Sequence, residues 1–263
     1  MIFSPRLLVV NADDFGQSSV VNQAIVMCFQ DGLISSTTIM ANMPAFEDAC
    51  ELARCNDLQD CIGVHLNFTD GEPLLPELQD NRKLCDDTGR FRRFRSRVLS
   101  RNDCAMLAAE AAAQIQRCRM AGLPLTHADS HQHVHTEPMV LQAIMPVLKE
   151  FQIRRLRISR NMDSRSLISP KRVAKSCFNR WLTIHGIRGT DYFGTVENFE
   201  NYRAANLLAG RSFEIMTHPS LDAHGALIDH IDNLLLADRL ANAFRDLQLS
   251  GYEPPTVAQA ARL

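Results

Sequence analysis

The feature that most constrains the fold is an alternation along the chain. Short runs rich in aliphatic and β-branched residues are followed by longer stretches with apolar residues at helical spacing. The short runs are predicted to be strands, over residues 6–12, 35–41, 61–68, 125–129, 155–159, 190–193 and 212–217. Helices are expected over residues 20–29, 46–53, 104–120, 138–150, 172–184 and 232–247. Strands that alternate with helices pair in parallel through right-handed crossovers, so we expect an α/β fold.

The number of strand–helix units favours a barrel over an open sheet, and a chain of 263 residues suits one such barrel. An open doubly wound sheet is the alternative, although the first strand-to-helix turn lacks the GxGxxG pattern of dinucleotide-binding folds. We therefore predict an irregular TIM-like (β/α) barrel with a single domain over residues 1–263. Residues 69–101 are polar and rich in charges, and we predict that they form a lid or an insertion.

Composition and charge exclude several classes of function. The formal net charge of −2 argues against a general nucleic-acid binder. The apolar run at residues 7–10 is too short for an export signal or a membrane span, so we predict a cytoplasmic protein without a membrane segment. The eight cysteines form no CxxC pair, which does not support a zinc ribbon. Residues 90–97 interleave Arg with Phe. We interpret them as a solvated loop anchored by its aromatics, with contact to an anionic substrate group or a partner subunit as the alternative.

Polar side chains suited to metal binding or acid–base chemistry gather at the ends of the predicted strands. Asp13 and Asp14 follow the first strand, His65 lies near the end of the third, and His218 follows the seventh. Residues 127–135, HADSHQHVH, span the end of the fourth. Carboxyl ends of parallel strands meet at one rim, where α/β proteins build their sites, so these segments are expected to converge. The other histidines are expected at the surface or at helix ends: His185, His224 and His230.

The pair of Asp13 and Asp14 suits a metal site because adjacent side chains of an extended strand point to opposite sides. One carboxylate can face a cation while the other faces a substrate. If both crowded one site, repulsion would raise the pKa of one of them unless a cation relieved it. The alternative is an Asx turn or a helix N-cap ahead of Val20.

The segment HADSHQHVH carries four histidines at alternate positions. In an extended backbone these imidazoles share one face with Asp129, and neutral imidazole is the commonest metal ligand. We expect the chain to curl after Asp129, so that not all of them reach one centre. Spacing alone does not choose among His131, His133 and His135. We interpret His65, which is flanked by apolar residues, as a further ligand rather than a core histidine.

Four motifs together resemble a known family. NADDFG near the N-terminus, GVHLN at 63–67, HADSHQHVH at 127–135 and EIMTHP at 214–219 are similar to motifs of the YdjC-like (ChbG-like) carbohydrate deacetylases. The resemblance implies an irregular TIM-like barrel, a divalent metal that is usually magnesium, and often a homodimer. It also implies a small N-acetylated carbohydrate as substrate, from which acetate is released to leave an amino sugar.

Carried onto this chain, the resemblance implies a metal triad of Asp14, His65 and His131. Asp13 would be the general base. His218, which its position alone would also allow as a ligand or a capped structural group, would be the general acid. Two histidines and one carboxylate also tolerate Zn²⁺ or Mn²⁺, so the ligands do not fix the metal.

Two other functions would use the same residues. A metal-dependent barrel hydrolase or isomerase acting on another bond, such as a phosphoester, would be expected to show basic residues beside the ligands. Arg157 and Arg160 are the candidates by strand position. A non-catalytic sugar-binding relative would keep the fold without the reaction. It is disfavoured because the full set of carboxylates and histidines is present.

Overall fold

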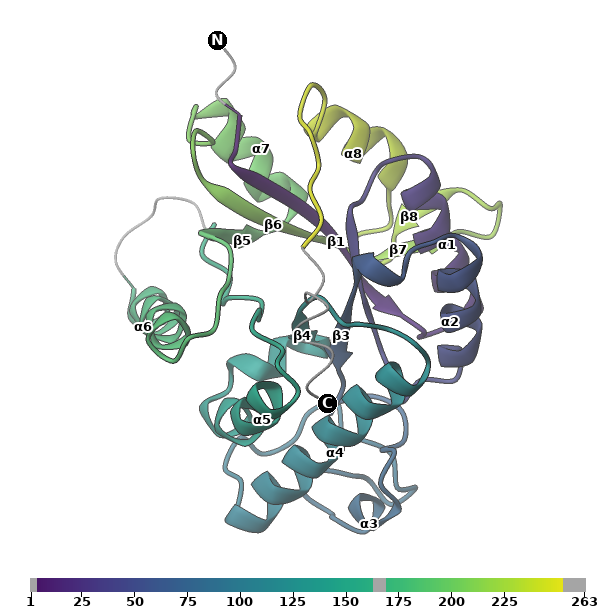
Figure 1. Ribbon diagram of the computed structural model, residues 1–263, viewed down its shortest axis with the longest axis vertical. Coiled ribbons are helices and arrows are strands. Elements are labelled where there is room, and N and C mark those ends of the chain that lie inside the picture. The colour runs from purple at the N-terminus through teal and green to yellow at the C-terminus, as the bar shows by residue number, and fades with distance from the viewer. Residues whose placement is uncertain (1–3, 163–168, 253–263) are drawn as a thin grey trace.

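The structure, a computed structural model, describes residues 4–162 and 169–252 (Figure 1). Its centre is a sheet of parallel strands: β1 (Leu7–Phe15), β2 (Ser36–Ile39), β3 (Ile62–Leu66), β4 (Ala128–Ser130), β5 (Tyr192–Gly194) and β6 (Ser212–Thr217). Their spatial order is β4–β3–β2–β1–β6–β5. β1 therefore lies in the interior of the sheet, and residues at its carboxyl end have neighbours on both sides.

Helices lie on the outside of the curled sheet (Figure 1). They are α1 (Ser19–Gln30), α2 (Phe46–Cys55), α3 (Pro76–Gln79), α4 (Arg101–Met120), α5 (Pro138–Glu150), α6 (Pro170–Ile184), α7 (Val196–Ala204) and α8 (Leu236–Ala243), with the short 3₁₀ segments η1 (Gln59–Cys61) and η2 (His131–Thr136). After β6 the chain forms a small antiparallel sheet of β7 (Pro219–Leu221), β8 (Leu227–Asp229) and β9 (Leu234–Leu235). Within the described ranges, no helix combines the length and the hydropathy needed to cross a membrane.

The expected α/β fold with parallel strands is confirmed, but the sheet curls into a half-barrel and does not close. The predicted strand at residues 155–159 forms isolated bridges, one to Ala128 and one to Arg188, in place of a ladder. At the end of this segment the side chain of Asn179 binds the backbone of Ser159, accepting from its N–H and donating to its carbonyl oxygen. The described part of the chain is compatible with a TIM-like plan whose closing edge is irregular.

Two other boundaries differ from the sequence-based expectation. The first strand continues three residues further, to Phe15, and so includes both aspartates. The predicted helix at residues 232–247 is shorter, because Leu234 and Leu235 pair with β8 before α8 begins. Neither change moves a strand end away from the rim where the polar residues gather.

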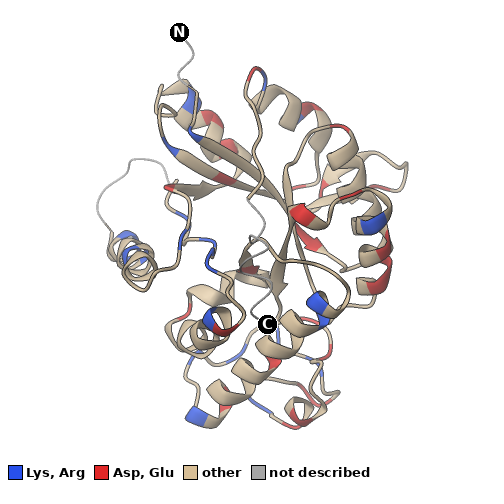
Figure 2. Cartoon of the chain, in the orientation of Figure 1, with Lys and Arg blue, Asp and Glu red and all other residues tan. Residues whose placement is uncertain are grey.

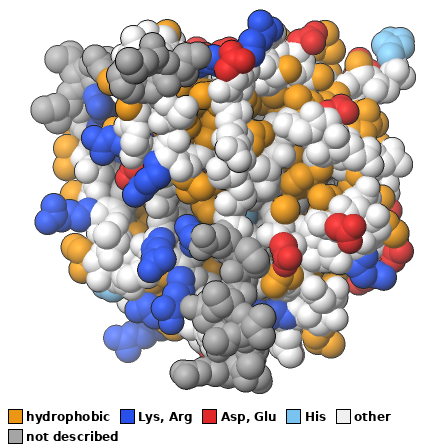
Figure 3. Space-filling model, turned by 45° about the horizontal axis from the view of Figure 1, so that its top comes forward, with side chains coloured by type: hydrophobic (Ala, Val, Ile, Leu, Met, Phe, Trp, Pro, Cys, Tyr) orange, Lys and Arg blue, Asp and Glu red, His pale blue; other side chains and the backbone are white. Residues whose placement is uncertain are grey.

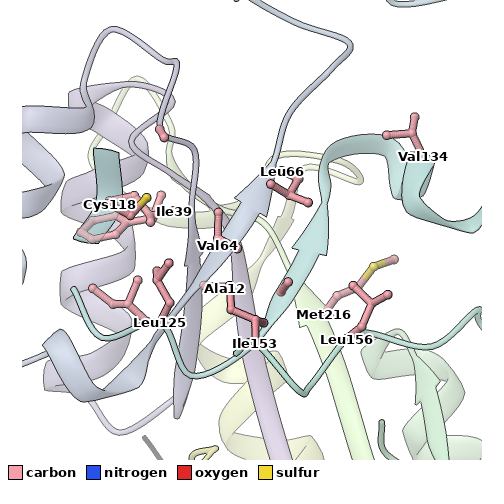
Figure 4. Packing of buried hydrophobic residues seen from close by; sticks show 14 of the residues in the cluster. Ala12, Ile39, Val64, Leu66, Cys118, Leu125, Val134, Ile153, Leu156 and Met216 are labelled. Atoms are coloured by element: carbon pink, nitrogen blue, oxygen red, sulfur yellow. The ribbon is translucent and has the colours of Figure 1, made fainter. Parts of the chain in front are cut away.

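The hydrophobic core lies between the sheet and its helices. β1 is buried from Leu8 to Phe15, as expected of a parallel strand covered on both faces. In the close view, side chains of neighbouring strands, including Ala12, Ile39 and Val64, lie near one another (Figure 4). Fully burying a side chain such as that of Ile39 contributes roughly 1.5–3 kcal/mol. The sheet is therefore a rigid support for the side chains at its strand ends.

The charged segment at residues 69–101 is held against the rest of the protein. On α4 the buried Glu110 accepts hydrogen bonds from two consecutive backbone N–H groups, those of Leu74 and Leu75. Phe91 is buried and packs edge-to-face on Phe68, two residues after the end of β3. These contacts place the segment beside the carboxyl ends of the strands. Its role as a lid stays a prediction.

Candidate metal and acid–base site

A cavity of about 750 Å³ opens at the carboxyl ends of the parallel strands. Its lining includes all the site residues named from the sequence: Asp13, Asp14, His65, His131 and His218. The two aspartates come from β1 and the first histidine from β3. The second comes from η2, directly after β4, and the third directly follows β6. The structure thus brings the separated segments together at one rim.

The two adjacent aspartates face different groups because β1 is irregular where they occur. The register between β1 and β2 shifts here, and Asp14 takes a left-handed backbone conformation with φ 72°. A bulge re-aims neighbouring side chains and is frequent beside active sites. Asp13 turns toward the buried Arg157, whereas Asp14 turns toward two histidines. The N-cap of α1 is Ser18, so neither aspartate has the capping role considered above.

Asp14, His65 and His131 form a compact cluster. Asp14 Oδ1 lies 3.1 Å from His65 Nε2 and 2.9 Å from His131 Nδ1. One ligand-type atom from each residue lies within 4.8 Å of the other two. A carboxylate oxygen and two imidazole nitrogens are donors that divalent cations bind, and three such ligands leave coordination positions open.

Asp129 determines which nitrogen of His65 faces the cluster. His65 Nδ1 lies 2.6 Å from Asp129 Oδ1, so Nδ1 donates its proton to this carboxylate and Nε2 points to Asp14. Metal-binding histidines are commonly oriented by such a carboxylate. Burial lowers the pKa of His65, but Asp129 and Asp14 outweigh burial and raise it to about 10. The imidazole therefore bridges two carboxylates in its protonated form, and a cation would take the place of the Nε2 proton.

The charges around the cluster also suit a divalent cation. Three buried carboxylates contact the buried guanidinium of Arg157; they belong to Asp13, Asp129 and Glu214. A fourth buried carboxylate, that of Asp14, faces the two histidines of the cluster. A second set of ligand-type atoms, on Asp13, His65 and Asp129, is equally compact. Arg157 Nη1, however, lies 2.6 Å from the carboxylates of both Asp13 and Asp129. Because the guanidinium already occupies that position, the set with Asp14 is the one that fits a cation.

Arg157 is the central residue whose position in the site the sequence analysis missed. Its strand position suggests it only as a contact for phosphate. Its buried side chain donates from Nη1 and Nη2 to Asp13 at 2.6 and 2.7 Å, and from Nε to Glu214 at 2.5 Å. Burial raises the pKa of Asp13, but Arg157 outweighs burial and holds this pKa below its usual range. Asp13 is therefore ionised and fixed in orientation.

The histidine-rich segment curls as expected, and its imidazoles separate. β4 ends at Ser130, after which Gln132 and His133 take left-handed conformations with φ 53° and 55°. This curl directs His131 to Asp14. His133 also lines the cavity, and its buried Nδ1 has no hydrogen-bond partner within the described chain.

The other two histidines of the segment are core residues. His127 Nε2 lies 3.3 Å from Asn11 Oδ1, and burial lowers the pKa of His127 to about 3. His135 Nε2 lies 3.1 Å from the carbonyl oxygen of Arg157, and burial holds the pKa of His135 well below its usual value. Both imidazoles are therefore neutral and support the backbone around the site.

His218 stands at the turn between β6 and β7. Its Nε2 lies 3.8 Å from Asp13 Oδ2 and its Nδ1 lies 3.9 Å from Asp229 Oδ1. Its backbone N–H donates to Asp229 Oδ2 at 3.0 Å, which ties the turn to β8. His230 was expected at the surface, but it lines the cavity with Nδ1 3.2 Å from the His218 carbonyl oxygen. The pairing of β7 with β8 brings His230 to the cavity, and no local pattern in the sequence predicts that pairing.

The segment at residues 69–101 forms part of the cavity wall. Its contribution is both polar and apolar, from Thr69, Asp70, Phe91 and Arg93. Phe91 anchors the basic run as expected, whereas Phe94 is 87% exposed and anchors nothing. The wall of the cavity therefore comes partly from a segment that carries none of the predicted metal ligands.

Known proteins resemble this chain in sequence and in fold. The sequence model of the family described as "YdjC-like protein" matches residues 7–252. A carbohydrate deacetylase of Brevibacillus brevis is 33% identical over 218 residues, or 81% of each chain. One of Vibrio cholerae serotype O1 is 42% identical over 149 residues, or 56% of each chain. A crystal structure from Enterococcus faecalis V583, whose name proposes cellobiose-phosphate cleavage, matches with a TM-score of 0.73 at 23% identity. The match covers 95% of this chain and 98% of that one, and it concerns the fold.

Proposed function

The chain belongs to the YdjC-like protein family, and on this premise we propose that it is a metal-dependent carbohydrate deacetylase. It hydrolyses the acetamide of a small N-acetylated sugar or oligosaccharide and releases acetate and an amino sugar. The observation that carries the proposal is the cluster of Asp14, His65 and His131 in a cavity that also holds Asp13 and His218. The names of the curated relatives support the substrate class.

The divalent cation in this proposal is held by Asp14, His65 and His131. When bound, such an ion supplies positive charge that polarises a carbonyl oxygen and acidifies water. The family resemblance favours Mg²⁺, while two nitrogen donors and one oxygen donor also accept Zn²⁺ or Mn²⁺. Asp129 contributes by keeping the proton of His65 on Nδ1, which leaves the Nε2 lone pair available.

Asp13 is the proposed general base. It is ionised and lines the cavity, and Arg157 binds both of its oxygens. The carboxylate accepts a proton from the attacking water as the new carbon–oxygen bond forms. Because Arg157 also weakens Asp13 as a base, the proton does not remain there. His218 Nε2, which lies 3.8 Å from Asp13 Oδ2, is the neighbour through which it can move on.

His218 is the proposed general acid. It gives a proton to the sugar nitrogen as the carbon–nitrogen bond breaks. Over the whole reaction, one water molecule supplies the hydroxyl group that joins the acetyl carbon and the proton that joins the amine nitrogen. Asp229 on β8 binds the backbone N–H of His218, and its Oδ1 lies 3.9 Å from His218 Nδ1. The cavity, at about 750 Å³, has the size of a small-molecule site, and its mixed wall of carboxylates, histidines and Phe91 suits a hydroxyl-rich ring.

The structure gives less support to a phosphoester substrate. Arg157 is one of the two arginines that strand position suggests for that role, but its N–H groups already donate to Asp13 and Glu214, and it also contacts Asp129. A non-catalytic sugar-binding role remains the second alternative, and activity measurements separate it from the proposal. A homodimer and a cytoplasmic location stay predictions.

The test is acetate release from N-acetylglucosamine and from its β-1,4-linked dimer and trimer. The protein is assayed as purified, after chelation, and after reloading with Mg²⁺, Zn²⁺ or Mn²⁺. We expect release that stops on chelation and returns with one of these ions. Acetate release that continues unchanged after chelation would contradict the metal site. Sugar binding without acetate release would favour the non-catalytic role.

Asp14→Asn and Asp70→Asn form a matched pair for this test. Both residues line the cavity, but Asp14 belongs to the cluster and Asp70 does not. We expect Asp14→Asn to lose both metal binding and acetate release, and Asp70→Asn to keep metal binding. If both variants bind the ion equally well, Asp14 is not a ligand.

A further inference from the structure

A second cavity lies at the opposite end of the parallel strands. It has a volume of about 1070 Å³ and forms where the strands begin. Arg6 directly precedes β1, Asp191 directly precedes β5, and Ser212 is the first residue of β6. Over the described chain, this cavity shares no lining residue with the metal and acid–base site. It is therefore a separate feature, and we call it the basic cavity.

Arginines dominate the charge of the basic cavity: Arg6, Arg155, Arg180 and Arg188. Asp191 is the one acidic residue among its described lining. That carboxylate is already bound by the backbone N–H and the hydroxyl of Ser212, both at 2.9 Å, and Arg6 lies 3.4 Å away. The other three arginines therefore meet no free carboxylate in the cavity.

The guanidinium groups of Arg155, Arg180 and Arg188 form no ion pair or hydrogen bond with any residue in the ranges 4–162 and 169–252. Arg155 lies over the ring of Tyr252, at 5.4 Å from its centroid. This cation–π contact positions the guanidinium without neutralising its charge. The cavity thus presents cationic donors whose hydrogen-bonding capacity is unused.

The surplus of positive charge is local. The whole chain has a formal net charge of −2, whereas the basic cavity has four arginines against one aspartate. Figure 3 shows Lys and Arg side chains gathered on the left of the visible face, where Figure 1 places α6 and β5. In Figure 2 the same side of the cartoon carries blue segments in α6 and in the chain before β5. Like charges held close together repel, and a bound anion relieves that repulsion.

We propose that the basic cavity binds a small phosphorylated compound through Arg155, Arg180 and Arg188. The planar guanidinium fork matches phosphate oxygens in pairs, and several such forks around one concavity suit a multiply charged anion. The concave shape and the negative net charge of the chain favour a small ligand over a nucleic acid, which needs an extended basic surface. The proposal does not depend on the deacetylase reaction.

The test is equilibrium dialysis of the full chain against radiolabelled inorganic phosphate, with chloride keeping the ionic strength constant. We expect one saturable site in the unmodified protein and at least tenfold weaker binding in the double variant Arg180→Gln/Arg188→Gln. Arg155→Gln is expected to weaken binding as well. Circular dichroism verifies that each variant is folded.

Two controls locate the bound phosphate. Arg54→Gln removes an exposed arginine on α2, outside the basic cavity, and Asp14→Asn alters the metal cluster. Both are expected to bind phosphate with the unmodified affinity. The proposal is overturned if the unmodified chain shows no saturable binding, if the double variant binds normally, or if the loss of binding accompanies Arg54→Gln or Asp14→Asn instead.

Discussion

His65 Nδ1 donates a hydrogen bond of 2.6 Å to Asp129 Oδ1, and both side chains are buried. This bond leaves His65 Nε2 as the nitrogen that faces Asp14. Replacing Asp129 with Asn removes the charge that holds the proton on Nδ1. We expect Asp129→Asn to bind a divalent cation about 10–100-fold more weakly, the usual range for such supporting carboxylates. Isothermal titration calorimetry with Mg²⁺, Zn²⁺ and Mn²⁺ measures the change.

Asp70→Asn is the control for this prediction, because Asp70 lines the same cavity and lies outside the ligand set. It is expected to bind the cation normally. Urea unfolding of Asp129→Asn separates a weakened site from a weakened fold, since Asp129 also contacts Arg157. Normal metal affinity in Asp129→Asn would show that this hydrogen bond does not orient a ligand.

Asp13→Asn tests the general base. The amide keeps the shape of the carboxylate but cannot accept the proton of the attacking water. We expect kcat for acetate release to fall about 10²–10⁴-fold while metal affinity stays within a few-fold of the unmodified protein. Steady-state kinetics and calorimetry on the same preparation give both quantities. Near-normal kcat would assign the base to another residue, such as His218, whose Nε2 lies 3.8 Å from Asp13 Oδ2.

Arg157→Met tests the buried charge network. Removing the guanidinium leaves the carboxylates of Asp13, Asp129 and Glu214 without their shared cation in a buried position. We expect the free energy of unfolding to fall by about 3–5 kcal/mol. Urea denaturation followed by circular dichroism measures it.

The matched control is Arg54→Met, which breaks an exposed ion pair with Glu51. That change is expected to cost less than about 1 kcal/mol. Equal losses in the two variants would mean that the buried network contributes nothing beyond an ordinary surface pair.

The buried His127 makes stability depend on pH. Burial lowers its pKa in the folded protein to about 3, whereas an unfolded histidine titrates at about 6.5. Between these values the unfolded chain binds a proton that the folded chain does not, so the free energy of unfolding falls as the pH falls. One such histidine contributes a slope of up to about 1.4 kcal/mol per pH unit in this window.

His127→Gln removes this titration and is expected to flatten the dependence of unfolding free energy on pH between about 6 and 4. Urea melts at several pH values measure the slope. His185→Gln, at an exposed position after α6, is expected to keep the slope of the unmodified protein. If His127→Gln leaves the slope unchanged, other groups dominate the acid sensitivity.

Strands and helices that are specified by a local pattern of apolar residues were predictable from the sequence. The apolar run at the start of β1 and the dense helical pattern of α4 appear close to their expected positions. The predicted strand at residues 155–159 forms only isolated bridges, and the backbone of Ser159 at its end is bound by Asn179 of α6, a contact that no local pattern indicates. Closure of the barrel likewise depends on contacts between residues distant in sequence, so the alternation of strands and helices alone could not decide it.

The positions of the candidate site residues followed from strand ends, but their partners did not. Arg157 contacts carboxylates on three different strands, at Asp13, Asp129 and Glu214, so its role exists only in the folded sheet. The glycine at position 63 in the GVHLN motif is also required by a tertiary contact. A Cβ there would lie 2.5 Å from the ring of His127. The motif is thus visible in the sequence, whereas the contact that requires the glycine is not.

The hydrogen-bonded side chains behind Asp13, those of Arg157, Glu214 and Tyr252, have a consequence for how the substrate specificity of the protein could change. Arg157 binds Asp13 and Glu214, and the hydroxyl of Tyr252 donates to Glu214 at 2.8 Å. None of these three residues belongs to the wall formed by the segment that contains Phe91. The charged network behind Asp13 and this part of the cavity wall are therefore built from separate parts of the chain. Under the proposed function, substitutions in this wall segment are expected to alter which sugar fits while the charged residues of the site stay in place.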